Sequence, residues 1–235
     1  MARLASPHHE RHRSEHIGWM RASVLGANDG LISTSALLLG IASANATPQV
    51  ILLTGVAALT AGALSMAAGE YVSVSSQADT EAADTAKERG ELEQAPDAEL
   101  AELTHIYVQR GLDKVLARQV AEQLTAHDAL GTHLRDELGI SGNFAARPVQ
   151  AALASAAAFS IGAMPPILLA WLWRAGSLPI AITLVTLVLL AVLGALAGRL
   201  GGASMVKGAI RVLFWGAMAM GVTAGIGHWF GVAAG

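Results

Sequence analysis

The feature that most constrains this chain is the position of its charged residues. The sequence has 15 basic and 18 acidic residues, but from Val149 to the C-terminus it has four basic residues and no acidic one. Between Tyr71 and Pro148 lie 21 of the 33 charged residues. Charged residues form 14% of the chain, against about 25% in typical soluble domains. The pattern predicts a membrane protein with one polar insert and excludes a single soluble core.

Five apolar stretches are long enough to cross a bilayer as helices, which takes roughly 20 residues each. They are residues 19–44, 48–70, 149–173, 178–198 and 212–231. We therefore expect an all-α fold, with transmembrane helices 1 and 2 in residues 19–74 and helices 3 to 5 in residues 148–235. Basic residues gather before spans one and three and between spans four and five, which predicts that the N-terminus and the insert are cytoplasmic.

The insert, residues 75–147, is expected to form a domain of three helices. Residues 75–93 contain no proline and could prolong span two directly. A second helix is predicted over residues 96–110, with Asp97 as a plausible cap, and a third over residues 113–138. The apolar side chains that should face the other two helices recur at helical spacing in the third helix, and they are Leu116, Val120 and Leu124.

Composition excludes several functions. The chain has no cysteine, so disulfides, thiolate zinc sites and cysteine nucleophiles are excluded. The acidic insert argues against nucleic acid and permits cations as partners. No nucleophile–base pair or phosphate-binding loop is evident, which disfavours an enzyme. A ferroxidase-like site of carboxylates and His133 is conceivable, and no sequence feature separates it from metal storage.

Two of the apolar spans contain residues that could bind an ion. Asp29 lies about ten residues into span one, where an unpaired carboxylate is costly and more often marks an ion or proton pathway than a structural contact. Met66 and Glu70 stand four residues apart near the end of span two, so they share one helix face. A thioether beside carboxylates suits a cation such as ferrous iron better than magnesium or calcium. We take these three residues as candidates for a transport pore.

Acidic residues and one histidine recur at helical spacing through the insert. Such side chains from three helices could converge on divalent cations, although their spacing alone fits a solvated acidic surface equally well. The candidates are Glu81, Asp84, Glu88 and Glu91 on the first helix, Glu99 and Glu102 on the second, and His133 and Glu137 on the third.

A polar tail, residues 1–18, is rich in histidine. Its histidines are His8, His9, His12 and His16. This composition is a weak indication of metal binding and equally fits a tail without structure. No short apolar stretch leads to a cleavage site, so no cleaved signal is expected.

The sequence resembles the vacuolar iron transporter family, in a bacterial-type form. The matching stretches are Gly26-Ala-Asn-Asp-Gly-Leu-Ile-Ser-Thr34, Ala63-Leu-Ser-Met-Ala-Ala-Gly-Glu-Tyr-Val-Ser-Val-Ser-Ser-Gln77, Ala126-His-Asp-Ala-Leu, and Asp-Glu-Leu-Gly at residues 136–139. The resemblance covers nearly the whole chain, and its second motif is highly specific.

This resemblance implies a homodimer with its translocation path between the subunits. It implies exchange of ferrous iron, and often manganese, for protons, with no tightly bound cofactor. Asp29 and Met66 match the family's pore residues. The residues that match glutamates of its cytoplasmic metal-binding domain are Glu88, Glu91, Glu99, Glu102 and Glu137. The match departs at His133 and Leu134, where plant members have two methionines.

Two functions follow from these expectations. The first is a proton-coupled exporter of ferrous iron or manganese in a bacterial inner or plasma membrane. The alternative is a membrane-anchored metal sensor or buffer, in which the insert binds metal and the spans only anchor it. Asp29 discriminates between the two, because an anchor has no use for a carboxylate near the bilayer midplane.

Overall fold

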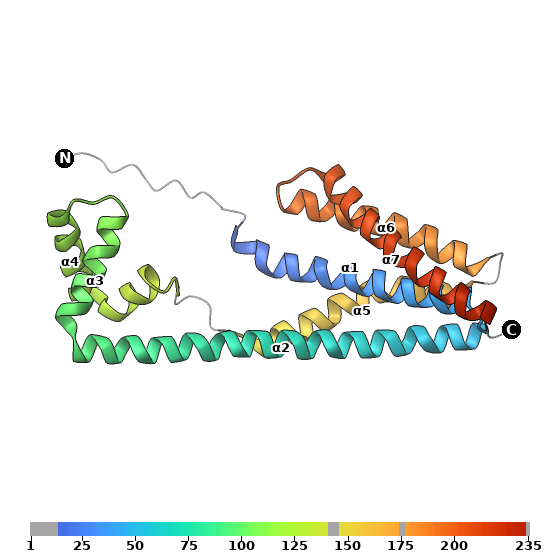
Figure 1. Cartoon of the computed structure of the whole chain (residues 1–235), viewed down its shortest axis with the longest axis horizontal. Coiled ribbons are helices and arrows are strands. Elements are labelled where there is room, and N and C mark those ends of the chain that lie inside the picture. The colour runs from blue at the N-terminus through green and yellow to red at the C-terminus, as the bar shows by residue number, and fades with distance from the viewer. Residues whose placement is uncertain (1–13, 141–145, 174–176, 234–235) are drawn as a thin grey trace. The chain divides into compact units, whose positions relative to one another are not determined.

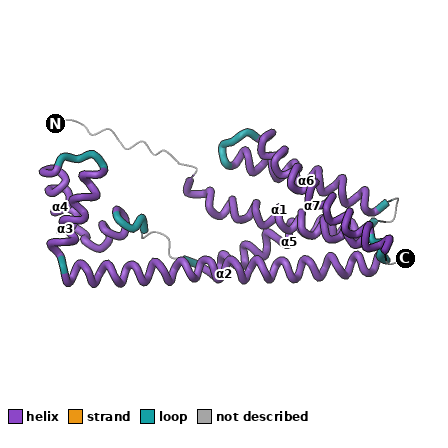
Figure 2. Tube along the Cα trace, in the orientation of Figure 1, coloured by secondary structure: helices purple, strands orange, loops and turns teal. Residues whose placement is uncertain are grey.

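The computed structural model describes residues 14–140, 146–173 and 177–233, which form helices and loops without any strand (Figures 1 and 2). The chain divides into two compact units, one formed by Met1–Glu70 with Gln150–Gly235 and the other by Tyr71–Val149. The helices are α1 (Ser14–Ser43), α2 (Pro48–Gln94), α3 (Pro96–Gln109), α4 (Lys114–Asp136), α5 (Pro148–Leu172), α6 (Leu178–Leu200) and α7 (Met205–Ala233).

Five of these helices are long and apolar enough to cross a membrane, which confirms the five predicted spans. They are α1, α2, α5, α6 and α7. The last helix begins at Met205, earlier than the predicted start of its span at residue 212. The backbone N–H of Lys207 lies 3.4 Å from Ser204 Oγ, which is the contact of a residue capping a helix N-terminus.

Helix α2 continues without interruption for 47 residues, as the alanine-rich sequence after Glu70 predicted. At 1.5 Å per residue it is about 70 Å long, whereas the hydrocarbon core of a bilayer is about 30 Å thick. The apolar first half is sufficient to span, and the charged second half belongs to the other unit.

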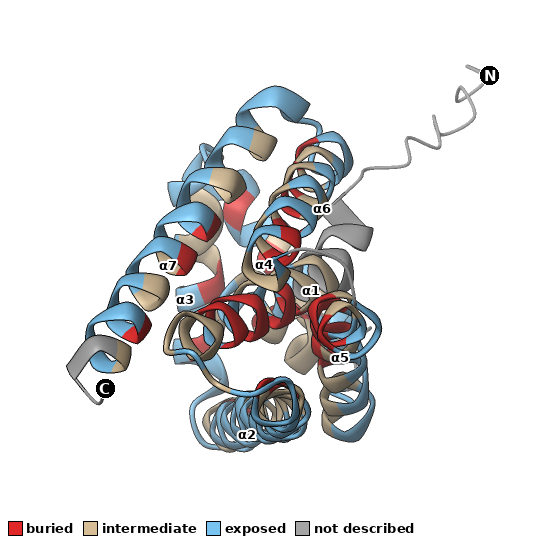
Figure 3. Ribbon diagram, turned by 90° about the vertical axis from the view of Figure 1, so that its right-hand side faces the viewer, coloured by how far each residue is buried: buried red, intermediate tan, exposed pale blue. Residues whose placement is uncertain are grey.

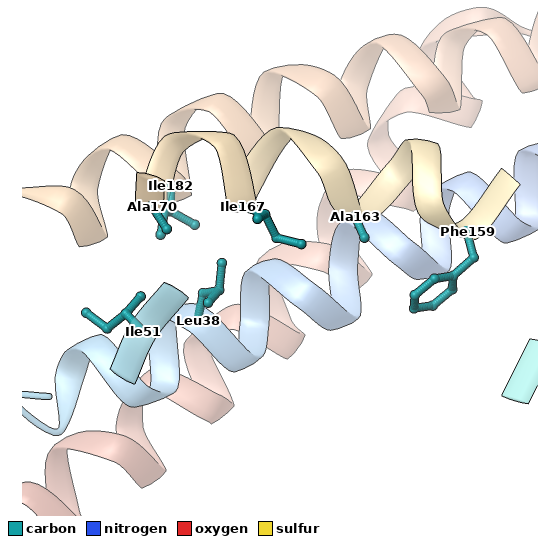
Figure 4. Close-up of a cluster of buried hydrophobic side chains, with 7 residues drawn as sticks. All are labelled: Leu38, Ile51, Phe159, Ala163, Ile167, Ala170 and Ile182. Atoms are coloured by element: carbon teal, nitrogen blue, oxygen red, sulfur yellow. The ribbon is translucent and has the colours of Figure 1, made fainter. Parts of the chain in front are cut away.

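We call the unit formed by Met1–Glu70 with Gln150–Gly235 the membrane unit. Its core lies where α1, α2, α5 and α6 meet (Figure 4). One face of α5 contributes four residues to this core at helical spacing. The Phe159 ring lies against Gly62 of α2. The seven buried residues are Leu38, Ile51, Phe159, Ala163, Ile167, Ala170 and Ile182.

Glycines bring α1 and α5 into backbone contact beside this core. A Cβ on Gly30 would collide with the backbone carbonyl of Phe159, and a Cβ on Gly162 would collide with that of Ala27. Both helices therefore need a residue without a side chain at the crossing, next to Asp29.

We expect Gly30→Ala to destabilise the membrane unit by about 1–3 kcal/mol, the usual cost of overpacking a core. The matched control is Gly221→Ala in α7, where a Cβ would meet no atom within 4 Å. It should be neutral or stabilising, because alanine favours helix over glycine by about 1 kcal/mol. Thermal unfolding in detergent measures both, and equal melting temperatures for the two variants would contradict the crossing.

Burial is uneven among the membrane helices (Figure 3). Buried positions are frequent along α1 and α5, whereas α2 and α7 leave most of their apolar surface exposed. In a membrane, such a surface contacts lipid or another protein chain.

In the second unit, α3 and α4 pack against each other. Helix α3 ends where predicted, because Gly111 adopts a φ of +102° and Leu112 N–H donates to the Tyr107 carbonyl. The prediction of Asp97 as a cap is wrong. The residue at that position is Ala95, and Asp97 lies inside the first turn of α3.

The prediction of a continuous third helix also needs correction. Asp128 has non-helical backbone angles, φ −160° and ψ 88°, which break α4 into two segments. In a straight helix Asp136 would lie about 33 Å from Lys114. Yet Asp136 pairs with Arg110, four residues before Lys114. The part of α4 after the break, residues 129–136, therefore runs back along α3, and we call it the return segment.

The predicted apolar face of α4 is wrong in part. Leu116 is exposed, Val120 and Leu124 are half-buried, and the fully buried residues of α4 before its break are Ala117 and Ala121. Small side chains bring α3 and α4 close together, so the face that is most buried is not the most hydrophobic one.

Candidate metal site

Four ligand-type side chains of the insert meet in one cluster. Glu88 comes from α2, Glu99 from the first turn of α3, His133 from the return segment and Glu137 from the residue after it. One ligand atom from each lies within 4.8 Å of all the others. We call these four residues the insert cluster.

The histidine ring lies at the centre of the cluster. His133 Nδ1 is 3.0 Å from Glu88 Oε1, 3.0 Å from Glu137 Oε2 and 3.8 Å from Glu99 Oε2. The His133 side chain is wholly buried, Glu88 and Glu99 are buried, and Glu137 is the most exposed member. Three carboxylates therefore face one nitrogen atom, and those of Glu88 and Glu99 are shielded from water whereas Glu137 is open to it.

Hydrogen bonding does not satisfy this arrangement. Nδ1 can hold a single proton, and its hydrogen-bond geometry favours Glu137. Glu88 Oε1 and His133 Nε2 are buried without a hydrogen-bond partner. Buried polar atoms without partners are unusual and costly in folded proteins. A divalent cation between Nδ1 and the three carboxylates would replace the single proton, bind Glu88 Oε1 and neutralise the carboxylates together, whereas it would not reach Nε2 on the other side of the ring.

The electrostatics of the cluster favour a cation. Burial raises the pKa of Glu88 above its ordinary value, and the charge of Glu137 raises it further. Burial also raises the pKa of Glu99, with a second contribution from Glu102. Carboxyl groups that resist ionisation when a site is empty ionise readily when a metal ion binds.

The other candidates of the insert lie outside the cluster. Glu91 pairs with Lys87 at 3.2 Å, and Glu102 is exposed. Both act on the cluster through their charge, because each contributes to the raised pKa of Glu99. Glu81 accepts a hydrogen bond from Gln77 at 2.8 Å. Asp84 is exposed.

The three pore candidates lie in the membrane unit. Asp29 is exposed on α1, which is one of the five candidate membrane spans. Met66 is half-buried on α2 and packs against the core cluster of Figure 4, and Glu70 is half-buried one turn further. Among the described residues of this chain, neither Asp29 nor Glu70 lies in a group of three or more side chains that could hold a metal ion.

Comparison with known proteins decides the family. The sequence profile of the VIT family matches residues 20–228, which include the insert, the first four spans and most of the fifth. The chain belongs to the VIT family. The resemblance drawn from the motifs is thereby confirmed.

Relatives of this VIT-family chain are similar over most of their length. A vacuolar iron transporter of Acanthamoeba castellanii is 49% identical over 224 residues, which cover 93% of this chain and 82% of that protein. Vacuolar iron transporter homolog 3 of Arabidopsis thaliana is 37% identical over 218 residues, 90% of this chain and 83% of the plant protein. Vacuolar iron transporter homolog 1 of Oryza sativa subsp. japonica is 34% identical over 215 residues, 91% of this chain and 75% of the rice protein.

The histidine-rich tail stays a prediction. His8, His9 and His12 lie outside the described residues. Only the backbone of His16 is described, in the first turn of α1.

Sequence reasoning missed a group of residues beside the insert cluster of this VIT-family chain. Asp136 accepts hydrogen bonds from Tyr107 Oη at 2.7 Å, Arg110 Nη1 at 2.9 Å and Arg135 Nη2 at 2.9 Å. Burial would raise the pKa of Asp136, but the hydrogen bonds from Arg135, Arg110 and Tyr107 outweigh it and lower the pKa to about 2. The contacts of Asp136 with Tyr107 and Arg110 join residues far apart in sequence, so no local pattern indicates them.

Proposed function

We propose that this VIT-family chain is a proton-coupled exporter of ferrous iron, and of manganese, which acts as a homodimer in a bacterial inner or plasma membrane. The insert would be a cytoplasmic metal-binding domain, and Asp29, Met66 and Glu70 would line the translocation path. The metal ion is cargo, and no tightly bound cofactor is part of the proposal.

Asp29 is the observation that favours transport over a membrane-anchored sensor. A charged side chain facing lipid near the centre of a span costs at least about 2.5–3.5 kcal/mol. In a single chain Asp29 is exposed, although α1 is otherwise among the better buried helices. A second subunit against this face would shield the carboxylate from lipid and place two of them beside a shared path.

The insert cluster supports a metal as cargo. Its donors are three carboxylates and one imidazole, which suit divalent ions such as iron and manganese. The bacterial location and the cytoplasmic side of the insert rest on the resemblance and on the basic residues flanking the spans.

Reconstitution in liposomes tests the proposal. The purified full-length chain is placed in vesicles that contain one dye for divalent metal and one dye for pH, and ferrous iron is added outside. Metal entry accompanied by proton exit supports the exporter. Metal binding without any flux through the wild-type chain would instead support a sensor or buffer.

Met66 should set the selectivity of the path. A thioether prefers softer transition metals, whereas magnesium requires oxygen ligands and keeps its water. We expect Met66→Ala to lower cobalt and ferrous iron flux several-fold and manganese flux least, with magnesium excluded throughout. A competition assay across the three transported ions measures the ratios.

The matched control for Met66 is Leu64→Ala, which shortens an exposed side chain on the same helix. Leu64→Ala should leave the ratios of the three metals unchanged. If Met66→Ala lowered all three fluxes equally, Met66 would be a packing residue, and recognition would rest on Asp29 and Glu70.

A further inference from the structure

The return segment carries half of the insert cluster. It includes His133, and it leads directly into Glu137. At its start, Asp128 breaks the helix, and its Oδ1 accepts a hydrogen bond from Gly131 N–H at 3.0 Å. This is the contact of a residue that caps a new helix. The segment is therefore a separate short helix, too short to be stable without contacts to its neighbours.

Tyr107, Arg110 and Asp136 fasten the far end of this segment to α3, and we call them the Asp136 clamp. Asp136 accepts from Tyr107 Oη and Arg110 Nη1 through its carboxylate. Arg110 Nη2 also donates to the Asp136 main-chain carbonyl at 2.8 Å, so it holds the backbone as well as the side chain. The guanidinium carbon of Arg110 lies 5.3 Å from the centre of the Tyr107 ring.

The clamp is close to the ligands in sequence. Asp136 lies one residue before Glu137 and one helical turn after His133. All three follow the break at Asp128, and the return segment between the break and Glu137 has only eight residues. A shift of the Asp136 backbone therefore moves both ligands relative to Glu88 and Glu99, which come from other helices. Ligand positions tolerate only about 0.5 Å of displacement in a working site.

We propose that Tyr107, Arg110 and Asp136 are positioning residues for the insert cluster, which hold His133 and Glu137 at binding distance from Glu88 and Glu99. The proposal rests on the proposed metal site. It assigns to the clamp no contact with the ion. Loss of residues that orient ligands typically weakens metal binding 10–100-fold.

Cobalt(II) is a suitable probe, because its absorption spectrum reports the number and geometry of its ligands. The experiment uses the full-length chain in detergent at neutral pH, and records cobalt affinity by titration together with the spectrum. Subtracting the spectrum of His133→Ala isolates the signal of the insert cluster from other sites. Thermal unfolding without metal is recorded in parallel.

Two variants test the clamp. Tyr107→Phe removes one hydrogen bond and keeps the ring, and Asp136→Asn removes the charge and keeps the shape. We expect both to weaken cobalt binding at the insert cluster about 10-fold or more and to change the His133-dependent spectrum. The control is Arg118→Gln on the first part of α4, which removes an exposed ion pair with Glu122 and should change neither readout.

The outcomes separate the two proposals. If the wild-type chain shows no His133-dependent cobalt signal, the metal site itself is wrong. If the wild-type chain binds and Tyr107→Phe retains its affinity and spectrum while only its melting temperature falls, the clamp is a structural brace and the positioning proposal is wrong. If Asp136→Asn does not fold, Tyr107→Phe alone tests whether the clamp positions the ligands.

Discussion

Replacing Asp29 by asparagine is expected to abolish ferrous iron transport in liposomes while the chain remains folded and in the membrane. The amide keeps the shape of the side chain but can neither carry the negative charge that attracts a metal ion nor exchange a proton with it. Metal flux and proton counterflow should disappear together in the two-dye assay, because the proposal assigns both to the same carboxylate.

The control for this variant is Leu25→Ala, one turn earlier on the same face of α1. Leu25 is 64% exposed, so shortening it disturbs the same surface without changing a charge. Its transport should stay close to the wild-type rate. Full metal flux through Asp29→Asn would remove Asp29 from the proposed path and return the sensor or buffer to first place.

The second large effect is expected at Glu99. Glu99→Gln should weaken manganese binding to the insert cluster on the order of 100-fold, because it replaces a buried anionic ligand by a neutral amide of equal size. Glu93→Gln is the control, since Glu93 is an exposed acid at the end of α2. Calorimetric titration of the full-length chain in detergent measures both, and equal affinities would show that the cluster does not bind the ion.

The same site should make metal binding sensitive to pH. Burial raises the pKa of both Glu88 and Glu99 above 4.5, the value of an unperturbed glutamate, so protons compete with metal at higher pH than they would for free carboxylates. A carboxyl group whose pKa is higher in the folded state stabilises the fold at pH values below its pKa in the unfolded chain. This stabilisation is lost as the pH rises through its pKa in the folded state.

Manganese should consequently raise the melting temperature less as the pH is lowered from neutral, because protons compete with the ion for Glu88 and Glu99. The shift should shrink in Glu99→Gln at neutral pH. A metal-induced shift that grew as the pH was lowered would contradict the assignment.

Most of the helical architecture could be predicted because it follows from properties that a sequence carries locally. Apolar length defines the five spans, and the uninterrupted alanine-rich stretch after Glu70 indicates that α2 continues. The break at Asp128 is different. It depends on one residue adopting an extended backbone, and tertiary contacts of Asp136 with Tyr107 and Arg110 make that fold-back favourable.

The candidate ligands could be named from the sequence, but which of them lie together could not. Glu88 and Glu91 are equivalent on a helical stripe, but Glu88 is buried against His133 of the return segment whereas Glu91 pairs with Lys87. His133 stood out by its spacing with Glu137. Its central position among three carboxylates depends on the break at Asp128, which the spacing of residues along a helix does not predict.

The donor set of the insert cluster limits what that cluster can discriminate. Sites of nitrogen and oxygen ligands bind first-row divalent ions in a common order, in which manganese and ferrous iron stand below cobalt, nickel and copper. If the insert cluster binds metal as proposed, its three carboxylates and one imidazole would hold nickel or copper more tightly than the proposed cargo. The ion that occupies it in a cell would depend on the free concentration of each ion. Occupancy of the cluster would then report which ion is abundant, and the cluster itself would not select iron.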